Sequence, residues 1–372
     1  MSASLTPVDL LYGADEETLR EVVRALLNAE CSPRSTIARM EGPSLFDQST
    51  WRRLAVDVGV ASLVVPEDLG GAGATWREVA VVVEELGAVV APLPVVTTAM
   101  ATVVLLSVDD ADLLAGVCAG EVVVLAVPWA GADASPLAVE YSNGRLRGVV
   151  RGVADLGAAE AVLVPAREAD GTLVITQLRR DAVGVAVDAL SALDQTRPLA
   201  DLRLDAAEAL VLVRGEPAEA SLEASLEVGV VLLASEQIGL AQGALDRSLS
   251  YVQVRKQYAR TIGSFQAIKH RFADLWTELA AARAVARYAA SCLATQHPDT
   301  KIATAMAGSV TSEVGLSIAE NMIQFHGGIG FTWEHPAHLY VKRARTSKIA
   351  LGSPVEHRRI LSDLVGVSRP YL

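Results

Sequence analysis

Apolar residues recur with a helical spacing in the first third of the chain. In residues 18–28 they fall on one side of a helix. Two further helices are predicted at 51–59 and 76–86, and a proline and several glycines break the pattern in the intervening segment, residues 60–73. Residues 1–120 are therefore expected to form an α-helical domain.

The period of the apolar pattern changes to two between residues 121 and 215. Short valine-rich runs alternate with turn residues, and Asn143-Gly144 and Asp170-Gly171 are strong hairpin signals. This domain is expected to be a small antiparallel β-barrel or sandwich inserted between helical domains. Its predicted strands are 122–127, 137–141, 145–150, 161–165, 172–177, 184–187, 203–205 and 209–213.

The helical period returns in residues 216–372, which are predicted to form a C-terminal four-helix bundle. The fold class is thus α+β, with three domains at 1–120, 121–215 and 216–372. The four long helices are predicted at 222–255, 264–295, 299–325 and 336–364.

Hydrophobic residues make up 51% of the 372 residues but aromatic residues only 5%, so the apolar content is mainly Ala, Val and Leu. Such a composition favours a helical protein with large buried surfaces or subunit interfaces. The longest uncharged run, residues 86–108, contains Pro92, Pro94 and three threonines. These residues favour a buried helix, turn and helix over a membrane span. Early acidic residues argue against a signal peptide.

Charge and cysteine content narrow the class of protein further. The net charge of −12 argues against nucleic acid as a partner, and it means that a polyanionic ligand would need a local basic site. Cys31, Cys118 and Cys292 have neither paired nor metal-like spacing, which favours a reduced cytoplasmic setting without a metal. The basic run 342–348 is expected to be a solvated or intersubunit helix face.

Two stretches carry candidate chemistry. Between two helical patterns, residues 255–278 contain a turn at Gly263 and the cations Arg255, Lys256 and Arg260. Arginine forks and a nearby helix N-terminus are suited to a phosphate, although a solvated helical hairpin would have the same pattern. The second stretch, residues 324–330, has three glycines in four positions after an apolar helix, which indicates a sharp turn or the close approach of a ligand.

In this order and about sixty residues apart, the two stretches resemble the C-terminal half of the acyl-CoA dehydrogenase family. Residues 66–73 and Glu84-Glu85-Leu86-Gly87 resemble a structural turn and helix end of the same family. The resemblance implies FAD as cofactor, an acyl-CoA thioester as substrate, and FAD contacts made partly across a subunit interface. The positions that match the family's FAD-binding residues are Arg255, Tyr258, Ile262, Gln266, Gln324, Gly327 and Gly328, with Tyr258 in place of Phe and Ala259 in place of a glycine.

The same resemblance shows what this chain has lost. The family's flavin-ring loop aligns with residues 127–135, and its Trp-Ile-Thr strand with Gly152-Val153-Ala154, so the stacking Trp and the Thr hydroxyl are absent. The two positions at which relatives place a catalytic Glu are occupied by Leu351 and Gly229. On a helix, Glu227 would be turned about 200° away from Gly229, and Glu236 would share its face about 10 Å further along the axis. No catalytic residue is therefore predicted.

These losses predict a division of labour between two chains. We expect a subunit of a heteromeric acyl-CoA dehydrogenase, resembling the non-catalytic member of actinobacterial enzymes that act on steroid side-chain thioesters. A related partner would carry the ring cradle and the catalytic Glu in an α2β2 heterotetramer, with an electron-transfer flavoprotein as a possible acceptor. Two alternatives stay open: a self-sufficient homotetramer whose base is displaced, for example to Glu236, and a non-enzymatic scaffold with the same fold. The acyl group, steroid or fatty, also stays open.

Overall fold

The N-terminal part of the chain is helical, as predicted. The computed structural model describes residues 8–40, 46–131 and 138–367. The predicted helix 51–59 is wrong in its second half, where the backbone is a π-helix in which Val58 N–H donates to the Arg53 carbonyl. The elements are α1 (Ala14–Glu30), α2 (Pro33–Met40), α3 (Gln48–Arg52), η1 (Arg53–Asp57), η2 (Val60–Ser62), η3 (Glu67–Leu69), α4 (Trp76–Val89), α5 (Val95–Val108) and α6 (Ala111–Cys118).

The uncharged run 86–108 forms the end of α4, a turn and α5, and nearly all of it is buried, as predicted. Helix α4 begins at a capping box in which Thr75 N–H donates to the Glu78 carboxylate at 2.9 Å. A glycine lets α4 and α7 (Glu216–Val254) approach closely, because a Cβ at Gly239 would lie 1.7 Å from the Glu84 carbonyl oxygen. This contact anchors the N-terminal helices to the C-terminal part of the chain.

The middle of the chain forms one eight-stranded sheet. Seven strands follow the order β6-β7-β3-β2-β4-β5-β8, and β1 lies off this path, beside β4. The Asn143-Gly144 hairpin is confirmed, with both residues at positive φ between β2 and β3. The expected antiparallel pairing holds for most of the sheet, but β1 pairs with β4 in parallel, and β2 pairs with β4 in parallel at Glu140 and Arg167. The strands are β1 (Val123–Leu125), β2 (Val139–Ser142), β3 (Arg145–Ala154), β4 (Ala161–Arg167), β5 (Leu173–Arg179), β6 (Val185–Ala189), β7 (Leu199–Glu208) and β8 (Leu210–Arg214), with the turn η4 (Leu156–Ala158) after β3.

The C-terminal part is a bundle in which the predicted fourth helix, 336–364, is in fact two helices. The first helix ends at Ser347, Leu351 and Gly352 then turn the chain with positive φ values, and Ser353 starts a new helix through a capping box with Glu356. The elements after α7 are β9 (Lys256–Gln257), β10 (Arg260–Thr261), η5 (Ile262–Ser264), α8 (Gln266–Ala294), α9 (Thr300–His326), η6 (Gly327–Phe331), α10 (Ala337–Ser347) and α11 (Pro354–Leu364).

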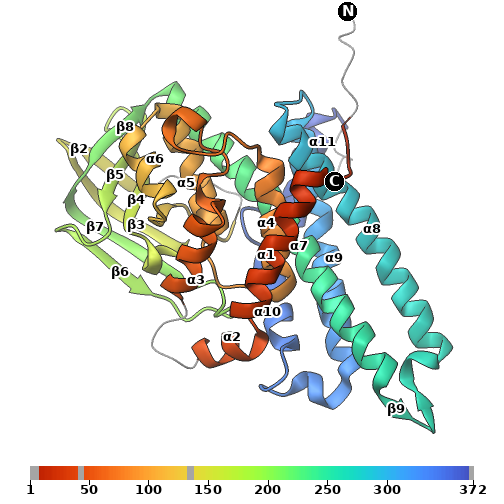
Figure 1. Ribbon diagram of the computed structural model, residues 1–372. Coiled ribbons are helices and arrows are strands. Elements are labelled where there is room, and N and C mark those ends of the chain that lie inside the picture. The colour runs from red at the N-terminus through yellow and green to blue at the C-terminus, as the bar shows by residue number, and fades with distance from the viewer. Residues whose placement is uncertain (1–7, 41–45, 132–137, 368–372) are drawn as a thin grey trace, which may run out of the picture.

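Figure 1 shows the curled sheet on one side of the molecule and the long helices α7, α8 and α9 on the other, with the N-terminal helices against both. Two segments, 216–254 and 300–331, are long and apolar enough to cross a membrane. The most apolar window of the first is 94% buried by the rest of the protein and that of the second 56%. Their apolar side chains therefore build the core of the bundle.

Candidate functional site

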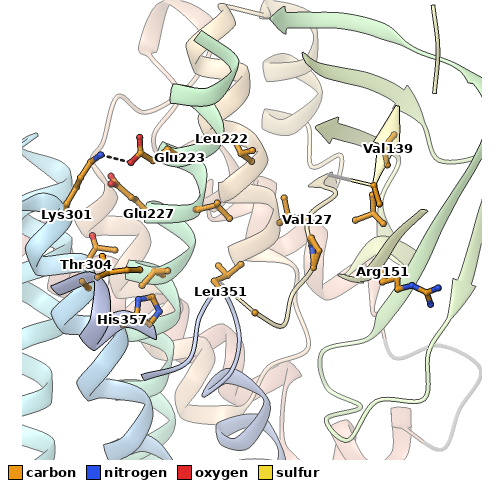
Figure 2. Close-up of a pocket in the computed structure, with 18 of the residues that line it drawn as sticks. Val127, Val139, Arg151, Leu222, Glu223, Glu227, Lys301, Thr304, Leu351 and His357 are labelled. Carbon is orange, nitrogen blue, oxygen red and sulfur yellow. Dashed lines mark hydrogen bonds and ion pairs between the residues drawn. The ribbon is translucent and has the colours of Figure 1, made fainter. Parts of the chain in front are cut away.

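A cavity of about 550 Å³ lies between the sheet and the C-terminal helices (Figure 2). Its wall on the sheet side is apolar and includes Val127, Val139 and Val150. Its opposite wall comes from α7, α9 and α11 and is partly polar. This size is typical of a pocket for a drug-sized or lipid-like ligand. The polar lining residues on the helical side are Glu223, Glu227, Lys301, Thr304 and His357.

The two positions at which relatives carry a catalytic Glu lie side by side in this fold. A Cβ placed on Gly229 would come within 2.5 Å of Leu351 Cδ1 and 2.8 Å of Met100 Sδ. Leu351 is 6% exposed and lines the cavity, so its isobutyl group fills the space over Gly229. Neither Leu351 nor Gly229 offers a proton acceptor to a ligand in the cavity.

The segments that align with the family's flavin-ring cradle are bonded directly to each other and to the loop that would carry the base. Trp129 N–H donates to the Gly152 carbonyl at 3.0 Å, and Leu351 N–H donates to the Trp129 carbonyl at 2.9 Å. Gly131 N–H reaches the Ile349 carbonyl at 3.1 Å, and Ala130 forms a β-bridge with Ala350. We call this pairing of 129–131 with 349–351 the strap. Residues 132–135 of the aligned loop lie outside the described residues.

The Trp129 side chain is buried under the strap. It is 4% exposed, and the Arg197 guanidinium lies over its ring at 4.9 Å from the centroid. Among the described residues, its indole N–H has no hydrogen-bond partner. The described part of the aligned ring loop is thus bonded to Gly152 and to residues 349–351, and Gly152 and Ala154 offer neither a ring to stack on a flavin nor a hydroxyl to bond its edge.

Glu236, the alternative base, is held in a buried ion network. Arg197 donates to both of its carboxylate oxygens at 3.0 and 2.7 Å, and Arg343 donates to it at 2.6 Å. Arg343 also donates to Asp194 at 2.6 Å. Burial opposes ionisation of Glu236, but the two arginines outweigh it and lower the pKa. Glu236 is 2% exposed and does not line the cavity, so it is placed to lock the loop before β7 and α10 onto α7.

Glu227, by contrast, lines the cavity. Helix geometry turns Glu227 about 200° from Gly229. The cavity is nevertheless lined both by residues 222, 223, 226, 227 and 230 of α7 and by Leu351, so this turn does not keep Glu227 out of it. Burial, aided by Glu223, raises the pKa of Glu227, while Lys301 opposes this. Glu223 itself pairs with Lys301 at 2.5 Å (Figure 2).

The first group of predicted cofactor-binding residues lies at the junction of α7 and α8. Arg255 caps α7, Gln266 opens α8, and β9 and β10 form a two-residue hairpin whose turn residues are Tyr258 and Ala259. Both turn residues have positive φ, 51° and 62°. Tyr258 is 89% exposed, and Arg255 and Gln266 also face solvent. Ile262, in η5, is half-buried. This junction, residues 255–266, which we call the hinge, therefore exposes its cations and its aromatic ring to solvent.

The second group follows the end of α9, and the structure places it at the same end of the bundle. Tyr251 of α7 stacks on His326, and Phe272 of α8 stacks on Phe325, with ring centroids 4.5 and 4.3 Å apart. Gly327 has φ 61° and ψ −137°, a conformation open essentially to glycine alone. A Cβ on Gly328 would meet nothing within 4 Å, and Gln324 is exposed. This segment, residues 324–330, which we call the glycine loop, leaves its backbone open to a ligand from outside the chain.

Sequence reasoning missed three parts of this arrangement. It took the basic run 342–348 for a solvated or intersubunit face, whereas Arg343 is 1% exposed. It gave no role to Asp194 and Arg197, which come from a loop with no motif. It also missed Thr304 on the cavity wall, for which the only local signal is a hydroxyl in the apolar helix α9.

The helical domain, the curled sheet and the bundle with a cavity between them are the architecture of flavin-dependent oxidoreductases that act on acyl thioesters. The chain belongs to the acyl-CoA dehydrogenase family: the family's C-terminal domain profile matches residues 219–365 and its N-terminal domain profile residues 13–109. The predicted family, fold class and cofactor are confirmed, since FAD is the cofactor of this family.

Among the known proteins that the chain resembles, acyl-CoA dehydrogenase IpdE2 of Mycobacterium tuberculosis is 36% identical over 354 residues, covering 94% of this chain and 97% of that protein. One solved structure is a variant of the steroid acyl-CoA dehydrogenase Tcur3481-Tcur3483, with 28% identity, TM-score 0.84, and 96% and 99% of the two chains covered. Another is the ChsE4-ChsE5 complex of Mycobacterium tuberculosis, with 24% identity, TM-score 0.86, and 97% and 100% covered, a likeness of fold.

Proposed function

We propose that this chain is a subunit of a heteromeric FAD-dependent acyl-CoA dehydrogenase and completes the FAD site of a related partner. The partner supplies the ring cradle and the catalytic Glu for α,β-dehydrogenation of an acyl-CoA thioester. The observation that carries the proposal is an asymmetry within one chain. The chain's own ring cradle lacks the stacking Trp and the Thr hydroxyl, and Leu351 fills the base position, while the hinge and the glycine loop remain exposed.

The open end of the bundle fits the half of FAD that one subunit lends to another. Arg255 offers a planar fork of donors suited to a phosphate, and the glycine loop lets a ligand approach the backbone. Exposed aromatic and apolar side chains surround this end, among them Tyr258, Phe331 and Trp333. Large exposed rings of this kind are typical of protein–protein interfaces. We therefore assign Arg255, Tyr258, Ile262, Gln266, Gln324, Gly327 and Gly328 to the partner's FAD.

The comparisons support the same reading at the level of class. The steroid acyl-CoA dehydrogenase Tcur3481-Tcur3483 and the ChsE4-ChsE5 complex each have two named components. By analogy, we propose an α2β2 heterotetramer that acts in the cytoplasm on a steroid-type acyl-CoA and passes electrons to an electron-transfer flavoprotein. Glu236 does not support the self-sufficient alternative, because both of its carboxylate oxygens are bound by buried arginines.

The test is co-expression of this chain with a related dehydrogenase subunit, followed by purification of the complex and measurement of bound flavin and turnover. Flavin and activity should require both chains, and Arg255→Ala should lower the flavin content of the complex. Arg179→Ala, an exposed arginine at the end of β5, is the control and should leave the flavin content unchanged. A partner that is fully active alone would refute the proposal. Unchanged flavin and activity with Arg255→Ala would favour the scaffold alternative.

A further inference from the structure

The cavity raises a question that the proposed function leaves unanswered, because a chain without a Glu at either base position still keeps about 550 Å³ of lined space. Its wall on the sheet side is formed by Val127, Val139 and neighbouring valines, so it suits an apolar body. Most of the polar lining residues lie on the opposite wall, on α7, α9 and α11, while Arg151 of β3 lies at the rim on the sheet side (Figure 2). A ligand that fills the cavity would therefore have an apolar body and one polar end.

Thr304 is an unusual hydroxyl for its helix. It is 7% exposed, it lines the cavity, and among the described residues its Oγ1 has no hydrogen-bond partner. In the same helix, Thr311 and Ser312 each donate to the carbonyl four residues earlier. A buried hydroxyl without a partner is unfavourable, because it has lost its hydrogen bonds to water. A ligand group that bonds to Thr304 would remove this cost.

Glu227 lines the same cavity from α7, which packs against α9 along its length. The hydrogen bonds and ion pairs of the described residues leave its carboxylate without a close partner, whereas the neighbouring Glu223 is paired with Lys301. A carboxylate accepts hydrogen bonds, and a threonine hydroxyl can donate one. A single ligand hydroxyl could donate to Glu227 and accept from Thr304, so it would satisfy both groups.

The charges of the lining are balanced. Glu223 and Glu227 are opposed by Lys301 and Arg151, and Arg151 is 82% exposed at the rim, near Asp201. Burial lowers the pKa of His357, which keeps this lining residue neutral at pH 7. Among the described lining residues there is thus no excess of cations to hold the phosphates of a CoA thioester. A neutral ligand meets these charges without an electrostatic penalty.

We propose that this cavity is a binding site of its own for a neutral, apolar alcohol, whose hydroxyl group is held between Glu227 and Thr304 and which is bound without being oxidised. The site is distinct from the FAD contacts at the far end of α7. It acts as a ligand-recognition site on the subunit that lacks a base.

The experiment compares four probes that share a ten-carbon chain: 1-decanol, decanoate, decylamine and decanoyl-CoA. Binding of each to the full chain, alone and in complex with its partner, is measured by isothermal titration calorimetry at pH 7. On the chain alone, 1-decanol should bind most tightly. Tighter binding of decylamine would show that the carboxylate selects a cation, and tighter binding of decanoyl-CoA that the cavity is an ordinary thioester site. Either result would overturn the proposal.

The variants separate recognition from folding. Thr304→Val keeps the shape of the side chain but removes the unpartnered hydroxyl, so it should raise the melting temperature of the ligand-free protein. The same variant should weaken 1-decanol binding roughly tenfold, the usual effect of a hydrogen bond lost from a buried site. Glu227→Met should weaken binding by a similar factor. Wild-type affinity in both variants would overturn the proposal.

The matched control is Glu219→Met, which changes an exposed carboxylate of α7 outside the cavity and should leave 1-decanol binding unchanged. Neither Thr304→Val nor Glu227→Met should alter the flavin content of the complex. Conversely, Arg255→Ala should leave 1-decanol binding intact. The failure of this proposal and the failure of the proposed function are therefore distinguishable.

Discussion

The carboxylate of Glu236 can be tested by a substitution that removes its charge and keeps its size. In Glu236→Gln, Arg197 and Arg343 lose a shared anion at positions where they are 6% and 1% exposed. Removing one partner of a buried ion pair costs about 3–5 kcal/mol, because it leaves a charge without compensation. Asp194 still pairs with Arg343, so we expect a loss of unfolding free energy near the lower end, about 3 kcal/mol.

An ion pair of the same length offers a matched control. Arg345 contacts Glu320 at 2.6 Å, the distance that separates Arg343 from Glu236, but the side chains of Arg345 and Glu320 are 58% and 48% exposed. Exposed pairs contribute about 0–1 kcal/mol. Glu320→Gln should therefore cost less than about 1 kcal/mol. The difference between the two variants measures the effect of burial at a fixed distance.

The assay is urea unfolding followed by circular dichroism, at pH 7 and at several lower pH values. The pKa of Glu236 is lowered in the folded protein from an ordinary value of 4.5. Its contribution to stability is thus fully present above pH 4.5 and is lost as the pH falls through the folded pKa. The gap between wild type and Glu236→Gln should narrow on acidification. The reasoning is refuted if Glu236→Gln costs no more than Glu320→Gln, or if it abolishes turnover of the complex at unchanged stability.

Three further predictions test the local geometry. Ala259→Gly should stabilise the protein by about 1 kcal/mol in urea unfolding, since Ala259 has φ 62° in the hairpin turn, and no gain would contradict the strain. Gly229→Ala should lower the free energy of unfolding by about 1–3 kcal/mol, because the added methyl group would collide with Leu351 and Met100. Adding Leu351→Ala should relieve part of this cost. If the two effects simply add in a double-mutant cycle, the contact is refuted. Burial, aided by His326 and Arg247, lowers the pKa of His335 to about 4. Because the unfolded chain then binds the proton more readily, the free energy of unfolding should decrease as the pH is lowered from about 6.5 to about 4. His335→Gln should flatten that part of the thermal unfolding profile, and an unchanged profile would exclude this histidine as its cause.

The order of helical and β-rich segments could be predicted from the sequence because both periodicities are local. The break at residues 348–353 was missed by the sequence analysis, although Gly352, Ser353 and Pro354 with Glu356 carry the pattern of a helix stop followed by a helix start. The parallel pairing of β1 with β4 was not readable, because an alternating pattern shows which face of a strand is buried and not the direction of its neighbour.

The ion network and the cavity depend on contacts between segments far apart in the chain. Asp194 and Arg343 are 149 positions apart, and neither belongs to a motif that names the other. A run of basic residues is predicted to face solvent unless its buried partners are known. For this reason Arg343 was predicted to be on a helix surface when it is in fact buried. The rotation of Glu227 away from Gly229 followed from helix geometry alone. Which neighbour it would then face could be learned only from the packing of α9 against α7.

Helix α7 keeps the roles of this chain physically apart. At a rise of about 1.5 Å per residue, Glu227 lies roughly 42 Å from Arg255 along the axis, and Glu236 lies between them. The network around Glu236 fixes the helix at its middle, so a change at the cavity end is not passed to the hinge by a shift of the helix. A substitution at Glu227 should therefore alter ligand binding alone, and one at Arg255 flavin binding alone. Loss of both functions in Glu236→Gln, together with a loss of stability, would show that this network holds both ends in place.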